Sequence, residues 1–163
     1  MNTLATLVIV LVGLVVLLLV AGRAGLLKGR APQLGVQDGR LKPPRRTPNS
    51  VSSQAALYPD APQRAYATIE PFAVRGDPAR SIERLRAIMA AMPGAQIIEA
   101  RPEYLYAQFT SSGLRFVDDT EFWFSRAENL IHVRSASRLG RRDFHVNRKR
   151  VEAIRAAYLQ APS

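Results

Sequence analysis

Residues 114–152 read LRFVDDTEFWFSRAENLIHVRSASRLGRRDFHVNRKRVE. Residues 114–125 and 130–138 each have strand-like alternation, and a turn sequence at 126–129 separates them. A period of two is typical of strands, in which successive side chains point to opposite faces. We therefore expect a hairpin here, followed by a basic loop and a helix over residues 147–160 that Asn147 caps.

The two expected strands have faces of different chemistry. One face carries the polar residues Asp118, Thr120, Ser135 and Ser137. The other carries the charged or titratable residues Asp119, Glu121, His132, Arg134 and Arg138. Acids on one strand can pair with arginines on its neighbour when they share a face, so we expect Asp119 and Glu121 to do so.

The preceding residues add a strand over 66–74, a helix that begins at Pro78 with Asp77 as its cap, and strands over 95–100 and 103–110. Apolar residues at helical spacing predict the buried faces of the two helices. They are Ile82, Leu85, Ile88, Met89 and Met92 in the first helix, and Val151, Ile154, Tyr158 and Leu159 in the last. The predicted fold is α+β: an antiparallel sheet of about five strands with two helices packed on one face.

The N-terminal run LATLVIVLVGLVVLLLVA, residues 4–21, has 18 residues and no charge. As a helix it spans roughly 27 Å, close to the hydrocarbon thickness of a bilayer. No basic side chain precedes it, unlike a signal peptide. We expect residues 1–22 to be an uncleaved, single-pass transmembrane anchor that contacts the lipid bilayer through residues 4–21.

Residues 23–64 form a Pro-, Gly- and Arg-rich segment that we interpret as a linker before a domain at 65–163. Val51 and Leu57 are the residues through which it can pack on the domain. The excess of arginine and lysine after the anchor predicts that the domain lies in the cytoplasm. The periplasm is the alternative side. The run KPPRR, residues 42–46, either contacts anionic lipid headgroups or stays in solvent.

The whole chain has a net charge of +10 and a pI of about 11.0, which favours anionic partners. It has no cysteine, which excludes a disulfide, a thiol nucleophile and a Cys-ligated metal. No zinc-ligand spacing, Gly-rich phosphate loop or dinucleotide fingerprint is present, so we predict no cofactor and no metal. Asp118 and Asp119 point to opposite faces and cannot share a cation without a bulge.

Cations crowd the start of the last helix, where the helix dipole is already positive. Such crowding is favourable if an anion is bound there. The residues we assign to anion binding are Arg134, Arg138, Asn147, Arg148 and Arg150. The polar residues that surround them are Asp118, Asp119, Glu121, His132, Ser135, Ser137 and Asp143. The anion can equally be internal: we favour the interpretation in which Asp118, Asp119, Glu121 and Asp143 are themselves the anions, in an internal ion-pair network. A vacant anion-binding notch is the sharper hypothesis.

The runs FVDDTEFWF and IHVRSASRLGRRDFHVNRKRVEAIR resemble the family called domain of unknown function 1499. LGVQDGRLKPP and TPNSVSSQA resemble the opening segment of that family. The resemblance covers residues 34–159 and implies an α+β domain of bacteria and plastids, often behind a signal or membrane segment. It implies no established activity, substrate or catalytic residue. Pro43 and Ser50 stand where the family commonly has two cysteines, which fits either a reducing cytoplasm or the loss of a dispensable disulfide. Together with the charge bias, the resemblance implies a single-pass protein of the bacterial inner membrane.

These patterns favour a membrane-anchored, non-enzymatic domain that binds an anionic ligand or an envelope protein. One alternative is a hydrolase-like or metal-dependent enzyme that uses His132, Asp119 and Glu121. A second, less favoured, is nucleic-acid binding by the basic region 134–155, with Tyr104, Tyr106 and Trp123 as stacking surfaces. No catalytic residue and no oligomeric state can be assigned from the sequence.

Overall fold

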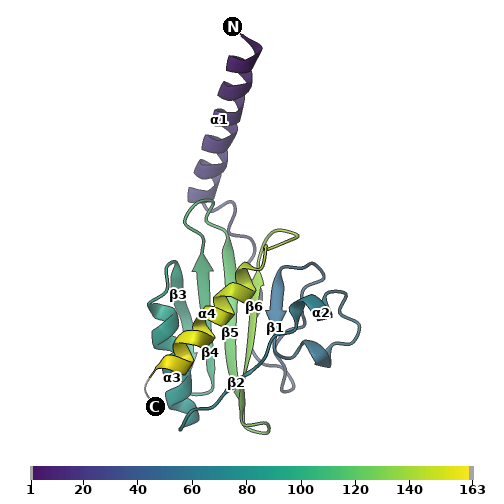
Figure 1. Cartoon of the computed structure of the whole chain (residues 1–163), viewed down its shortest axis with the longest axis vertical. Coiled ribbons are helices and arrows are strands. Elements are labelled where there is room, and N and C mark those ends of the chain that lie inside the picture. Colours follow the sequence, from purple (N-terminus) through teal and green to yellow (C-terminus); the bar gives the residue numbers. More distant parts are fainter. Residues whose placement is uncertain (1, 162–163) are drawn as a thin grey trace.

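The computed structural model describes residues 2–161. Helix α1 (Thr3–Arg23) projects from one end of the domain (Figure 1), and its apolar side chains are not covered by the rest of the protein. Within the described residues it is the one helix that is long and apolar enough to cross a membrane. The predicted N-terminal helix is therefore present.

The domain is built on a six-stranded sheet in which every strand pair is antiparallel. The strands are β1 (Ser50–Ser52), β2 (Phe72–Ala73), β3 (Ala95–Arg101), β4 (Tyr104–Thr110), β5 (Val117–Ser125) and β6 (Leu130–Ser137). Their order is β1-β6-β5-β4-β3, and β2 also pairs with β6. The hairpin of β5 and β6 therefore lies in the middle of the sheet.

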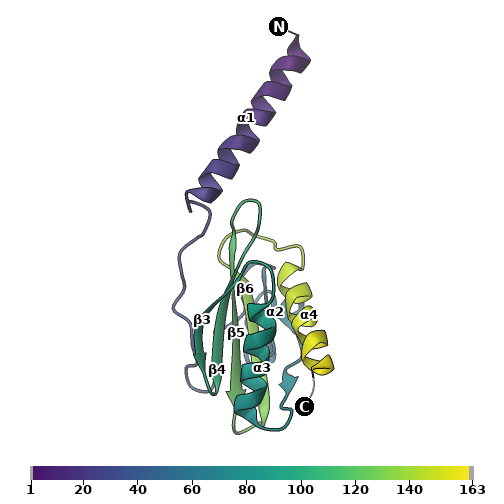
Figure 2. The ribbon, with the colours of Figure 1, turned by 90° about the vertical axis from the view of Figure 1, so that its left-hand side faces the viewer.

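Helices α3 (Pro78–Ala90) and α4 (Val146–Gln160) cover the same face of this sheet (Figure 2). The side chain of Asp77 accepts a hydrogen bond from the Arg80 amide at 3.0 Å, so the predicted cap of α3 is confirmed. The largest core side chains between helices and sheet include Leu85, Phe122 and Ile154. The α+β prediction, with both helices on one face, is confirmed.

The predicted strand over residues 66–74 is mostly wrong. Residues 64–67 form a short helix, α2 (Arg64–Ala67), and β2 alone pairs with the sheet. The amides of Ala67 and Thr68 donate to the carbonyls of Gln63 and Arg64 at 2.8 and 3.0 Å, which closes a helical turn. The alternating pattern of residues 66–74 predicted a strand, but local backbone hydrogen bonds form a helical turn at the start of this stretch.

Two other element boundaries differ from the sequence prediction. Strand β5 begins at Val117 and not at residue 114, because Arg115 has a positive φ of 61° that ends the extended backbone. Helix α4 begins at Val146, so Asn147 lies inside it and is not its cap. Leu159, predicted to be buried, is 62% exposed because it lies beside the buried stripe of Val151, Ile154 and Tyr158.

The segment interpreted as a linker, residues 23–64, is called the covering segment from here on. Its first part covers the sheet face opposite α3 and α4 (Figure 2), and its strand β1 joins the sheet beside β6. Leu41 is 1% exposed, and its amide donates to the Gln54 side chain at 2.8 Å. The Tyr58 hydroxyl donates to the Leu41 carbonyl. Val51 is buried in β1, whereas Leu57 is 45% exposed. From about Leu41 onward this segment is packed into the domain.

This packing gives a test of whether the segment stabilises the fold. Leu41→Ala should lower the free energy of unfolding by roughly 2–5 kcal/mol, since it leaves a cavity under the segment. Leu57→Ala, in the same segment but exposed, should cost about 1 kcal/mol or less. Urea unfolding of the full chain in detergent micelles, followed by near-UV circular dichroism, measures both. Equal losses in the two variants would contradict the packing.

Candidate functional site

On the helix face, Asp143 holds the start of α4. Its carboxylate accepts hydrogen bonds from the backbone amides of His145 and Asn147, both at 3.1 Å, and from the Tyr66 hydroxyl at 2.5 Å. The first amides of a helix have no intrahelical partner, and a side-chain oxygen stabilises them. Asp143 therefore supplies the acceptor that the sequence analysis assigned to Asn147.

Asn147 is fully buried and lies at the centre of what we call the cap network. The network comprises Asp118, Thr120, Ser135, Ser137, Asp143, Asn147 and Arg150. The Asn147 side-chain oxygen accepts from the Ser135 hydroxyl at 2.6 Å. Its amide nitrogen donates to Asp143 at 2.8 Å and to Ser137 at 3.0 Å. Asn147 thus links α4 to the end of β6.

The cations at the start of α4 also have internal partners. Arg150 donates to the Asp118 carboxylate at 2.6 Å and to the Asn147 side-chain oxygen at 2.8 Å. Arg148 donates to the backbone carbonyls of Tyr66 and Thr68 at 2.6 and 2.8 Å. The carboxylates of Asp118 and Asp143 therefore occupy the place of the external anion that the basic helix start suggested.

The charge of Asp143 is stabilised by these contacts. Burial by itself raises the pKa of Asp143, but the hydrogen bonds from Tyr66, Asn147 and His145 outweigh it, and the pKa lies below its usual value. Burial and the same contact to Asp143 raise the pKa of Tyr66 to about 12. At neutral pH the pair is therefore a phenol that donates to a carboxylate.

The opposite face of the sheet carries two further buried carboxylates, of which Asp119 is fully paired. Arg138 donates to both of its oxygens, at 2.8 and 2.9 Å, and the Tyr106 hydroxyl donates at 2.6 Å. A bidentate pair of this kind has strong, directional hydrogen bonds. The pairing across neighbouring strands is the one that the alternation predicts.

Glu121 and Arg134 are opposite each other on β5 and β6 but are paired differently. One oxygen of Glu121 accepts from the Gly35 amide at 2.9 Å and from the Tyr104 hydroxyl at 2.8 Å. The other lies 3.5 Å from an Arg134 nitrogen and has no hydrogen bond. Burial raises the pKa of Glu121, and the nearby positive charge of Arg134 opposes that rise only in part.

The Arg134 guanidinium is the least satisfied buried group on this face. Its side chain is 5% exposed, and its Nε has no hydrogen-bond partner within the described chain. Within the described chain, the ion pair with Glu121 is the only salt bridge of Arg134. A buried guanidinium nitrogen without a hydrogen-bond partner is unusual, because its N–H group is costly to desolvate.

Arg134 lines a groove of about 510 Å³ between the covering segment and β6. We call it the linker groove. It is lined by Arg30, Pro32, Lys42, Pro43, Pro44, Arg45, Arg46, Thr47, Asp119, Arg134, Ala136, Ser137 and Arg138. Among these, the single acid, Asp119, is already paired with Arg138. The remaining cations give the groove a positive potential, and the charge of Arg45 acts on Arg134 itself.

Comparison of the sequence with protein-family models identifies the family of this domain. The family model described as a protein of unknown function, DUF1499, matches residues 40–158, which is most of the chain. The chain belongs to the DUF1499 family. Comparisons with curated proteins and with solved structures gave no match.

The DUF1499 domain does not bring His132, Asp119 and Glu121 together as one catalytic group. The His132 ring contacts Glu128 at 2.5 Å through Nε2 and the Ser53 hydroxyl at 3.1 Å through Nδ1. The Ser53 oxygen in turn accepts from the Val133 amide at 2.9 Å. No group of three potential metal ligands occurs among residues 2–161. His132 is therefore part of a separate contact at the other end of the sheet.

The five residues assigned to anion binding from sequence also separate in the DUF1499 domain. Arg134 and Arg138 face the covering segment, whereas Asn147, Arg148 and Arg150 belong to the helix side. The same division breaks the basic region 134–155 into two faces, which weakens the nucleic-acid alternative. Tyr104 and Tyr106 donate to Glu121 and Asp119, and the Trp123 ring stacks on His132.

Sequence reasoning missed the covering segment as part of the site of this DUF1499 domain. Gly35, Arg45 and Arg46 were named only as linker residues, and Tyr66 was placed in a strand. The charge of the run at residues 42–46 was visible, but its position against β6 depends on contacts far apart in the chain. The linker groove is therefore formed by β6 together with residues that precede β1 in the chain.

The Asp143 contacts lead to a test by pH. Asp143→Asn should lower the free energy of unfolding by about 2 kcal/mol, since a charged acceptor at the helix start is lost. The pKa of Asp143 is lowered in the folded state, so its contribution is present above its ordinary value of 3.8 and is lost as pH falls through the lower folded value. Thermal unfolding of wild type and variant at a series of pH values measures this.

The two curves should converge at the acid end and separate as the pH rises. Asp60→Asn, an exposed acid, is the matched control and should follow wild type. A constant gap between the wild type and Asp143→Asn at every pH would contradict the role of the Asp143 charge.

Proposed function

We propose that this protein is a membrane-anchored binding domain that takes an anionic group, a phosphate or a carboxylate, in the linker groove. The observation that carries the proposal is the Arg134 guanidinium, which is buried at the groove wall and whose Nε has no hydrogen-bond partner within the described chain. An oxyanion presents planar pairs of acceptors that match a guanidinium fork. Binding of such a group would place a negative charge beside Arg134.

The charges around Arg134 support the proposal. Asp119, the acid in the groove wall, is neutralised by Arg138, whereas Arg30, Lys42 and Arg46 have no carboxylate partner in the described chain. Cations gathered in a concave, partly desolvated surface attract anions more strongly than the same cations in open solvent. Glu121 lies 3.5 Å from one Arg134 nitrogen and forms an ion pair with it, but makes no hydrogen bond to it.

The membrane attachment supports a binding role at the cytoplasmic side of the inner membrane. We propose the cytoplasmic side because arginine and lysine residues are in excess directly after α1. The acids on β5 are paired with arginines, which is the arrangement expected of a binding or structural domain and not of a hydrolase. The ligand is then either a small anion or an acidic group on a partner protein.

The first test of the groove uses inorganic phosphate and the full chain in nanodiscs of zwitterionic lipid. Amide chemical-shift changes should be confined to residues 30–47 and 134–138. Arg134→Lys keeps the charge but removes the fork, and it should weaken phosphate binding roughly tenfold. Arg126→Lys, an exposed arginine in the turn between β5 and β6, is the control and should bind as wild type does.

Loss of folding is checked separately, because removal of one partner from a buried ion pair is costly. Arg46→Gln lies on the exposed rim of the groove and should also weaken binding without loss of stability. Unchanged phosphate affinity in both groove variants, or equal shifts around Arg126, would refute the proposal.

The raised pKa of Glu121 leads to a second test. Above that pKa the carboxylate is ionised and repels an anion at Arg134; below it, the repulsion is gone. Affinity should therefore increase as pH falls through the raised pKa of Glu121. Inorganic sulfate is the probe for a calorimetric titration, since its charge does not change over this range.

Glu121→Gln should bind sulfate with nearly the same affinity across that range, because the variable charge is absent. Glu99→Gln, an exposed carboxylate on β3, should retain the wild-type pH dependence. A pH dependence that persists in Glu121→Gln would assign the effect to another group.

A further inference from the structure

The anchor and the domain are in direct contact at one end of the sheet. Helix α1 has 21 residues and is about 32 Å long, which is close to the thickness of the hydrocarbon layer, so no helical spacer remains outside it. Gly22 lies so close to the loop before β5 that a Cβ there would be 2.5 Å from the Leu114 carbonyl oxygen. This end of the domain therefore faces the bilayer at short range.

A second close approach fixes the other loop at the same end. Gly29 has a φ of +69°, and a Cβ on it would meet Leu139 at 2.9 Å. The Arg138 amide donates to the Val117 carbonyl at 3.0 Å, which holds the loops at 111–116 and 138–145 next to each other. Both loops lie at the end of the domain from which α1 projects, and the loop before β5 lies beside α1 (Figure 1).

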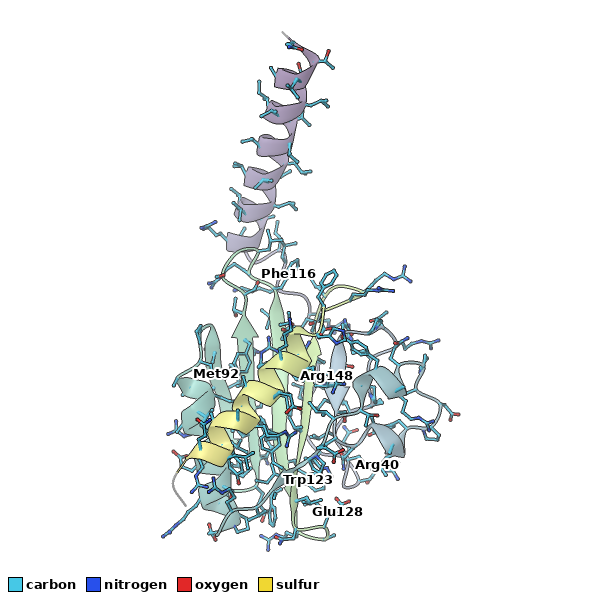
Figure 3. The ribbon with its side chains drawn as sticks, in the orientation of Figure 1. Arg40, Met92, Phe116, Trp123, Glu128 and Arg148 are labelled. Carbon is cyan, nitrogen blue, oxygen red and sulfur yellow. The ribbon has the colours of Figure 1, made fainter. Side chains whose placement is uncertain are left out.

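These two loops and the residues just after α1 expose several large apolar side chains to the exterior. Phe116, Leu139 and Phe144 are 40%, 41% and 79% exposed, and Leu26 just after α1 is 74% exposed. Figure 3 shows Phe116 at the end next to α1, whereas Trp123 and Glu128 lie at the far end. Clustered exposed apolar residues mark contact surfaces for a protein or a membrane.

The backbone at Phe144 holds its ring outward. Phe144 and His145 have φ values of 51° and 65°, a left-handed conformation that is uncommon for bulky residues. The Asp143 carboxylate maintains it through the His145 and Asn147 amides. A buried network thus supports a conformation that presents an aromatic side chain to the exterior.

Exposed cations surround the apolar residues. Arg115, Arg141 and Arg142 are exposed in the two loops, and Lys28 is exposed beside them. Apolar side chains with flanking arginine and lysine are the composition of surfaces that lie in the boundary between headgroups and acyl chains. We call these residues, with Leu26, Phe116, Leu139 and Phe144, the membrane-proximal face.

We propose that the membrane-proximal face inserts into the surface of the same bilayer that α1 spans, with its apolar side chains below the headgroups and its arginines on anionic phosphates. The domain is then held against the membrane by the anchor and by its own loops. This contact is independent of the linker groove, and either can exist without the other.

Single nitroxide labels on the full chain test the contact, and the absence of native cysteine makes each label unique. Phe116→Cys, Phe144→Cys and the control Glu128→Cys are labelled and reconstituted in liposomes that contain anionic phosphatidylglycerol. The ratio of oxygen to nickel-chelate accessibility should be several-fold higher at positions 116 and 144 than at 128. A ratio at 116 and 144 equal to that at 128 would overturn the proposal.

A second copy of the chain would also shield the labels. Dipolar broadening between labels that disappears as the protein is diluted with lipid, and a return of nickel-chelate accessibility with it, would identify that occupant and overturn the membrane contact. Shielding that is unchanged by dilution supports it.

Charge reversal tests the electrostatic contribution of the arginines to the membrane contact. Arg141→Glu with Arg142→Glu should move the label at 144 toward water in anionic liposomes, whereas Arg126→Glu at the far end should not. An identical accessibility ratio in all three chains would overturn the assigned role of the arginines.

Discussion

The arrangement of the domain depends on three carboxylates in the central strand β5. Asp118, Asp119 and Glu121 are nearly or fully buried. Burial of a charge without a partner costs far more free energy than most single contacts provide. Each carboxylate is therefore matched by an arginine, and the arginines come from different elements: Arg150 from α4, Arg138 from the end of β6 and Arg134 from within β6.

These three pairs connect the layers. Alternation along β5 directs Asp118 to the helix side and Asp119 and Glu121 to the side of the covering segment. On the helix side the partners of Asp118 and Asp143 determine where α4 begins. On the other side, the Gly35 amide on Glu121 helps to hold the covering segment in place. The charge pattern of one strand thus selects what packs on each face of the sheet.

Sequence reasoning found the part of this pattern that is local. A period of two is visible in residues 114–138, so the shared face of Asp119, Glu121, Arg134 and Arg138 could be predicted. The start of α4 could not, because it depends on Asp143 and on two left-handed residues, Phe144 and His145, that no periodicity marks. The covering segment was taken for a linker because Leu41 is buried by residues that have no regular spacing from it.

The contrast among the three ion pairs explains why one of them belongs to a groove. Asp118 and Asp119 meet their arginines at 2.6 and 2.8 Å. Glu121 uses one oxygen for Gly35 and Tyr104, and the other lies 3.5 Å from Arg134. The covering segment therefore orients Glu121 through a backbone amide and also forms the opposite wall of the space that Arg134 faces.

Helix α1 is joined to the same groove by a short stretch of chain. Arg30 lines the groove, and its neighbour Gly29 lies against Arg138 and Leu139, which belong to the groove wall and to the loop at 138–145. Only five residues, 24–28, separate Arg23, the last residue of α1, from Gly29. A chain of that length leaves little freedom for the groove to move away from helix α1. The position of Arg134 relative to α1 is therefore set by the fold and not by a flexible tether.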